Sequence, residues 1–149
     1  MKKLILIPAL FCLFMLNVAS MCSSDDDNSD DNSPSTSTVT TNVTSGTWRV
    51  TYFKEDDVVQ TNNFNGYNFS INSNGTMVAV NGSTTKNGTW STYSDSGSTK
   101  FDITFPDANG PFEEITEDWR VLSSSTTKLE LKHVSGGDGS IDLLTFEKN

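Results

Sequence analysis

Apolar and polar residues alternate along the chain from residue 46 to the C-terminus. Phe101, Ile103 and Phe105 occupy every second position in one segment, and Leu129 and Leu131 do the same in another. A period of two places successive side chains on opposite faces of an extended strand, whereas a helix would repeat its apolar positions every three or four residues. The pattern therefore predicts β-strands throughout this part of the chain.

The alternation divides into short segments separated by turns rich in Gly, Asn, Ser and Asp, which are typical of hairpin connections. In the first segment, Trp48, Val50 and Tyr52 are expected to share the inward face. A single helical turn at 112–115 precedes the sixth segment, and no window of eleven residues predicts a longer helix. The eight predicted strands cover residues 46–53, 67–71, 76–80, 86–93, 100–105, 117–122, 128–133 and 141–147.

Short connections make sequential strands pair antiparallel with their neighbours. Eight strands in such a meander can remove both exposed edges by closing into a cylinder. The sequence therefore predicts an all-β fold, a small eight-stranded antiparallel up-and-down barrel. A sandwich of two sheets is the alternative that the pattern leaves open.

The N-terminus has a different character. Lys2 and Lys3 precede an apolar stretch at 4–18, and small residues follow it. Fifteen apolar residues are fewer than the roughly 20 that a membrane-spanning helix needs. A basic start, a short apolar stretch and a small-residue exit are typical of a secretory signal peptide, which we place at 1–21.

Two cleavage patterns fit the end of this segment. Residues 19–22 resemble a lipobox, in which Cys22 becomes the lipidated first residue, although Met21 departs from the usual Gly, Ala or Ser. Ordinary cleavage after Ser20 would instead release a soluble secreted or periplasmic protein. The residues that follow Cys22 resemble the acidic export signal of surface lipoproteins in the Bacteroidetes, and they are Ser23, Ser24, Asp25, Asp26 and Asp27. This resemblance implies a lipid anchor in the outer membrane and exposure at the cell surface.

Residues 22–45 contain five Asp and no Lys, Arg or aromatic residue. Such a composition buries too little apolar surface to offset the entropy cost of ordering, so we predict a disordered acidic tether. The remaining residues, 46–149, form one predicted domain. The net charge of −9 argues against nucleic acid as a partner, because phosphates require clustered Lys and Arg.

The domain at 46–149 resembles the lipocalin-like domains of the calycin type found in Bacteroidetes surface lipoproteins. The resemblance rests on the Gly-x-Trp motif of Gly46 and Trp48, the eight-strand meander, Asp118-Trp119 in the sixth strand, and the hairpin from Lys128 to Gly137. It implies that Trp48 packs across a closed barrel end beneath an arginine near the last strand.

The lipocalin arginine has no direct counterpart here. Only Lys148 stands near the end of the last predicted strand, and Arg120 in the sixth strand is the candidate substitute. The Gly-x-Trp motif also recurs at residues 88–90, so the family resemblance depends on the whole pattern.

Residues that carry chemistry are scarce in the predicted domain. The two cysteines of the chain, Cys12 and Cys22, both precede the domain, and His133 is the one histidine, expected at the barrel rim. This composition argues against thiolate, disulfide and His-rich zinc sites, and no Gly-x-Ser-x-Gly motif is present. The carboxylates at 113–118 and 56–57 are expected in solvated loops. We therefore predict a protein that is not an enzyme and needs no cofactor or metal.

Thirteen aromatic rings lie in the predicted domain, and they either fill its core or line a cup at the open end. A cup would bind a small hydrophobic or amphipathic molecule. The alternative is an envelope interaction or structural protein with a packed barrel and no ligand cavity. The candidate cup residues are Tyr52, Tyr67, Phe69, Trp90, Phe101 and Trp119.

Overall fold

The structure, a computed structural model, describes residues 32–107 and 109–149. The predicted signal peptide, Cys22 and the export signal at 23–27 lie outside these residues. None of the helices within the two described ranges is long and apolar enough to cross a membrane.

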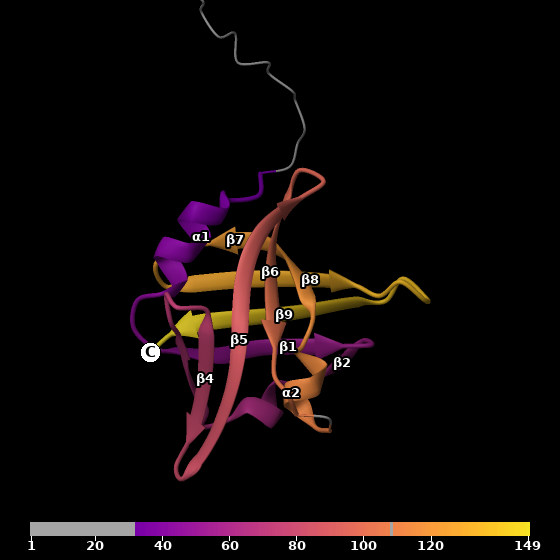
Figure 1. Cartoon of the computed structure of the whole chain (residues 1–149). Helices are drawn as coiled ribbons and strands as arrows, with labels where there is room; N and C mark the ends of the chain where they lie inside the picture. The colour runs from indigo at the N-terminus through magenta and orange to yellow at the C-terminus, as the bar shows by residue number, and fades with distance from the viewer. Residues whose placement is uncertain (1–31, 108) are drawn as a thin grey trace, which may run out of the picture.

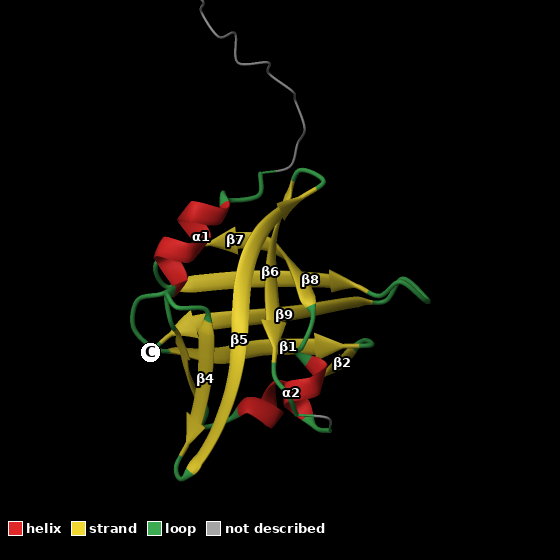
Figure 2. Ribbon diagram, in the orientation of Figure 1, coloured by secondary structure: helices red, strands yellow, loops and turns green. Residues whose placement is uncertain are grey.

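Eight antiparallel strands form a closed barrel (Figures 1 and 2). Strand β1 pairs with β3 on one side and with β9 on the other, so the first and last strands of the meander meet. The prediction of an all-β up-and-down barrel is confirmed, and the two-sheet sandwich is excluded because the ring of strands closes. The strands of the ring are β1 (Trp48–Glu55), β3 (Asn68–Ile71), β4 (Thr76–Asn81), β5 (Thr84–Asp95), β6 (Ser98–Thr104), β7 (Asp118–Ser124), β8 (Lys128–Val134) and β9 (Ile141–Lys148).

Four short elements accompany this ring. The two-residue strand β2 (Val58–Val59) pairs with the end of β1, and the 3₁₀ helix η1 (Thr61–Phe64) follows it. Helix α2 (Pro111–Glu114) confirms the helical turn predicted before the sixth strand. Helix α1 (Thr36–Val43) precedes the barrel.

Aromatic side chains fill the barrel near its α2 end. The ring of Phe112 lies 5.1 Å from that of Tyr67, 5.6 Å from that of Phe64 and 4.8 Å from that of Phe105, each in an edge-to-face arrangement. Such arrangements add to the stability gained from burial alone. Phe112 therefore acts as a plug that closes this end.

Helix α1 covers the other end and corrects the predicted disordered tether over 32–45, the part of 22–45 that the structure describes. Ser35 caps the helix by accepting a hydrogen bond from the backbone N–H of Thr38 at 3.2 Å. Val39 and Val43, one turn apart, are completely buried. The average composition of 22–45 conceals this narrow apolar stripe, which is enough to order the helix once the barrel provides a surface for it.

The chain before α1 also belongs to the folded domain. The side chain of Ser33 accepts a hydrogen bond from the Thr99 backbone N–H on β6 and donates one to the Val121 carbonyl on β7, each 3.1 Å long. The Thr99 hydroxyl donates to the Pro34 carbonyl at 2.6 Å. The predicted start of the domain is Gly46. The described contacts show that the folded part of the chain begins earlier.

A β-bulge in β1 corrects the predicted inward face of that strand. The pairing with β9 shifts register between Val50 and Tyr52, so one extra residue is inserted at that point. Phe53 is therefore buried in place of Tyr52, whose side chain reaches a groove on the outer wall. Strict alternation cannot anticipate this, because an inserted residue reverses the orientation of every side chain after it.

The first Gly-x-Trp motif packs at the barrel end near α1. The indole N–H of Trp48 donates to the Val43 carbonyl at 2.9 Å, and the Lys148 ammonium lies 5.6 Å from the centre of the Trp48 ring. A Cβ on Gly46, whose φ is +77°, would approach the Lys148 side chain to 2.6 Å. Lys148 thus lies over the tryptophan, and the suggested role of Arg120 was wrong, because Arg120 lines a pocket on the outer wall.

The second Gly-x-Trp motif packs differently. The ring of Trp90 stacks on that of Phe101 at 5.3 Å, and its indole N–H donates to the Asn72 carbonyl at 2.8 Å. A Cβ on Gly88 would approach the Thr104 carbonyl oxygen to 2.5 Å and the ring of Phe105 to 2.7 Å. This glycine therefore makes room for an aromatic ring of the core.

Candidate functional site

In the described part of the chain, the six residues predicted to line a cup lie on both sides of the barrel wall. Phe69, Phe101 and Trp119 are completely buried, Trp90 is 7% exposed, and Tyr67 packs against the same core. The indole N–H of Trp119 donates to the carbonyl of Ile115 at 3.0 Å. Five of these residues thus contribute to the packed interior, and Tyr52 lies outside it.

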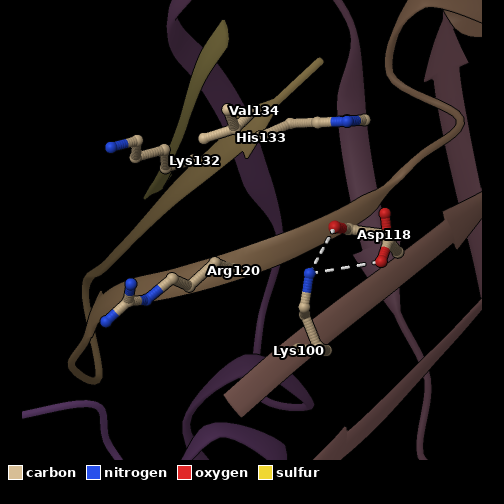
Figure 3. A pocket seen from close by; sticks show the side chains of 6 residues that line it. All are labelled: Lys100, Asp118, Arg120, Lys132, His133 and Val134. Carbon is tan, nitrogen blue, oxygen red and sulfur yellow. Dashed lines mark hydrogen bonds and ion pairs between the residues drawn. The ribbon is translucent and has the colours of Figure 1, made fainter. Parts of the chain in front are cut away.

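A pocket of about 260 Å³ lies on the outer wall of the barrel, where β6, β7 and β8 run side by side (Figure 3). We call it the wall pocket. Its lining residues are Lys100, Asp118, Arg120, Lys132, His133 and Val134.

Three cationic side chains lie in a row across this pocket, and we call them the basic row. In the antiparallel register, Lys100 on β6 is opposite Arg120 on β7, and Arg120 is opposite Lys132 on β8. Residues opposite one another project from the same face of a sheet, so the three side chains share the outer wall. Like charges side by side on one face of a sheet cost energy unless oppositely charged groups lie near them.

One acidic residue lies within the row. The Lys100 ammonium bonds to the Asp118 carboxylate at 3.2 Å and to the Asp118 carbonyl oxygen at 3.4 Å (Figure 3). The neighbouring Asp102, opposite Asp118 in the register, has a pKa raised by burial and by the charge of Asp118. Lys100 is thus partly neutralised by a carboxylate of the neighbouring strand.

His133 lies at the rim of the barrel, where its position in the alternation places it. Its ring meets that of Trp119 edge-on at 6.0 Å. Its Nδ1 atom lies 3.3 Å from a carboxylate oxygen of Glu117, the residue before β7. The side chain is 18% exposed, so it contributes to the pocket while being held by the core.

An amphipathic groove of about 430 Å³ lies next to the wall pocket on the same outer wall. We call it the wall groove. Tyr52, Leu122 and Leu143 supply its apolar surface, and Leu143 is directly opposite Lys132 of the basic row. Leu122, the extra residue of a bulge in β7, is 44% exposed.

An ion pair lies along the wall groove. The Lys128 ammonium lies 2.6 Å from the Glu130 carboxylate, which also accepts a hydrogen bond from Ser123. These two contacts lower the pKa of Glu130, Lys128 having the larger effect. Glu130 therefore remains ionised, which makes this side of the groove polar.

The predicted carboxylate cluster at 113–118 is divided by the fold. Asp118 enters the wall pocket and Glu117 contacts His133, whereas Glu114 faces Glu55 near the α2 end of the barrel. Burial and the charges of Glu114 and Asp142 raise the pKa of Glu55. The cluster is therefore not a single pair of acids arranged for catalysis.

The lysines of the basic row were not singled out from the sequence. Lys100 and Lys132 each occupy an outward position in an alternating strand, which by itself is typical of any solvated face. Only the register of three neighbouring strands aligns them with Arg120. Their outward positions in the alternating pattern were the one sequence signal that could have pointed to them.

No protein-family model matches this chain, and no curated protein matches it. A solved structure of a DUF4847 family protein from Bacteroides vulgatus is similar over 72% of this chain and 94% of its own, with 17% sequence identity and a TM-score of 0.47.

Proposed function

We propose that this protein is a lipid-anchored binding protein of the cell envelope, and not an enzyme. It binds an amphipathic molecule on the outside of the barrel, with the anionic head in the wall pocket and the apolar part in the wall groove. The observation that carries the proposal is the row formed by Lys100, Arg120 and Lys132 on three adjacent strands.

The outer wall suits this role better than the interior. Helix α1 covers one barrel end, and Phe112 plugs the other. Opening the interior to a ligand would require displacing side chains that are already closely packed, and each large aromatic side chain contributes roughly 3–5 kcal/mol to stability. The proposal therefore combines a packed barrel without an internal cavity, which was the alternative in the sequence analysis, with a ligand site on the outer wall.

The arrangement of the two hollows favours an amphipathic ligand over a simple anion. Leu143 lies directly beside Lys132, so apolar and cationic surfaces adjoin on the outer wall. Tyr52 and Leu122 extend the apolar surface away from the cations. A carboxylate head gains charge-assisted hydrogen bonds in such a site, and an alkyl chain gains roughly 0.8 kcal/mol for each buried methylene.

The lipid anchor would keep the domain close to a membrane. Nine residues, 23–31, lie between Cys22 and the first described residue, Asn32. A fully extended chain from Cys22 to Asn32 spans at most about 35 Å. The end of the barrel that carries α1 would therefore lie nearest the lipid, and the wall would remain accessible to molecules released from it.

Decanoate binding tests the wall pocket. We expect Lys132→Met to weaken decanoate binding by about tenfold, because a charge-assisted hydrogen bond contributes roughly 1.5–3 kcal/mol. Isothermal titration calorimetry of the purified protein measures this change. Arg49→Met removes an exposed cation of β1 outside the pocket and should change the affinity less than about twofold. Equal binding of uncharged decyl glucoside, or an unchanged affinity of Lys132→Met, would contradict the proposal.

Membrane partitioning tests the anchor. Expressed in a host with lipoprotein processing, the protein should enter the detergent phase of a Triton X-114 extraction, whereas Cys22→Ser should remain in the aqueous phase. The reason is that the acyl chains attached to the cysteine supply roughly 0.8 kcal/mol per buried methylene. Mass spectrometry of the N-terminal peptide identifies the modification. A wild-type protein that begins at Met21, with an unmodified Cys22, would instead support ordinary cleavage after Ser20.

A further inference from the structure

We propose a second site at the edge of the wall pocket, where Glu117, Asp118 and His133 bind a divalent transition-metal ion of the Zn²⁺ class. Ligand atoms of these three side chains all lie within 4.8 Å of one another. The first two residues lie at the start of β7 and His133 lies near the end of β8, and these strands are hydrogen-bonded neighbours. The proposal does not depend on the amphipathic ligand.

The spacing of the ligand atoms fits tetrahedral coordination. Zn²⁺ binds imidazole nitrogen and carboxylate oxygen at roughly 2.0–2.2 Å, and two such ligands at a tetrahedral angle lie about 3.3–3.5 Å apart. Nδ1 of His133 lies 3.3 Å from Oε2 of Glu117. These two atoms already have the separation that the ion would impose, and Asp118 offers a third ligand atom within 4.8 Å of both.

The Nδ1 atom of His133 is buried and makes no hydrogen bond in the described part of the chain. Its ion-pair neighbour is the Glu117 carboxylate, and a buried polar atom without a hydrogen bond is uncommon in folded proteins. An ionised carboxylate offers only acceptor oxygens, so the neutral imidazole tautomer with its lone pair on Nδ1 cannot donate a hydrogen bond to it. A cation between Nδ1 and the Glu117 carboxylate would satisfy both groups.

The types of ligand select the class of metal. Ca²⁺ and Mg²⁺ prefer sites made entirely of oxygen atoms, whereas imidazole favours Zn²⁺ and its transition-metal neighbours. Packing of the His133 ring against the edge of Trp119 limits its rotation, which keeps the nitrogen directed at the site. Three protein ligands leave at least one coordination position for water or for an anion in the wall pocket.

Lys100 competes with the metal for Asp118, because its ammonium bonds to Oδ2 of that carboxylate. Lys100→Met should therefore strengthen Zn²⁺ binding, by about threefold to tenfold, since it frees a carboxylate oxygen and removes a nearby positive charge. The same substitution should weaken decanoate binding. Opposite changes in the two affinities would distinguish the metal site from the anion site.

The decisive experiment uses purified protein without a polyhistidine tag, freed of metal by a chelator. Zn²⁺ is titrated while the imidazole resonances are followed by NMR, and calorimetry gives the stoichiometry. His133 is the one histidine of the chain, so every imidazole signal reports on this site. We expect one Zn²⁺ per chain and a large shift of the His133 signals.

Matched variants complete the test. His133→Asn and Glu117→Gln should each lower the Zn²⁺ affinity by about tenfold or more, since even residues behind the ligands of known sites contribute that much. Glu113→Gln, an exposed carboxylate of α2, should leave it unchanged. Circular dichroism confirms that each variant is folded. Unshifted imidazole signals, equal Zn²⁺ binding by His133→Asn, or Ca²⁺ binding as tight as that of Zn²⁺ would overturn the proposal.

Discussion

Replacing Trp48 with alanine should lower the free energy of unfolding by about 3–5 kcal/mol, the range found for large aromatic residues in a core. Trp48 is completely buried, and its indole N–H is the hydrogen-bond donor to the Val43 carbonyl at the end of α1. The substitution would therefore leave both a cavity and an unpaired buried carbonyl. Urea unfolding followed by circular dichroism measures the change.

Trp48→Phe separates these two effects. It keeps most of the ring but removes the indole N–H, so we expect it to cost about 1–3 kcal/mol, the penalty for an unsatisfied buried acceptor. Thr47, next to it in the sequence, is exposed, and Thr47→Ala should cost less than about 0.5 kcal/mol. A loss below 1 kcal/mol for Trp48→Ala would mean that this ring does not support the barrel end.

Truncation should show that α1 is part of the fold. A chain that begins at Gly46 lacks Val39 and Val43, and burial of a valine side chain contributes roughly 1.5–3 kcal/mol. It also lacks Ser33, which joins β6 to β7. We therefore expect this chain to be less stable by about 3 kcal/mol or more, measured by thermal and urea unfolding.

A chain that begins at Asn32 is the matched control, because it retains every described contact of α1 and of the residues before it. Its stability should equal that of the longer protein within about 0.5 kcal/mol. Equal stability of the two truncated chains would instead support the tether that composition predicted for residues 22–45, with the helix making no net contribution.

The strand pattern was predictable because it is a local property. Each predicted segment overlaps a strand of the ring, and their ends differ by a few residues at most, as for the predicted 128–133 and the observed β8 (Lys128–Val134). A period of two and the turn residues between segments depend only on near neighbours in the chain. Closure into a barrel then follows from the need to pair the two outermost strands.

Two local departures were not predictable in this way. The bulge in β1 exchanges Tyr52 for Phe53, and the helix at 36–43 is ordered by two valines in an otherwise polar segment. Both depend on contacts with parts of the chain distant in sequence. Composition and periodicity average over such contacts. Tyr52 was therefore wrongly assigned to the predicted cup, and the residues of α1 were wrongly assigned to the predicted tether.

Alternation alone specified the all-β class, the number of strands in the ring and the burial of most aromatic residues. Tertiary structure decided which side chains fill the interior and which meet on the outer wall. The interior is filled by residues that a cup would have needed, while Lys100, Arg120 and Lys132 become neighbours only through strand register. The physical reason is that periodicity determines whether a side chain points inward or outward, whereas hydrogen bonding between strands determines which outward side chains meet.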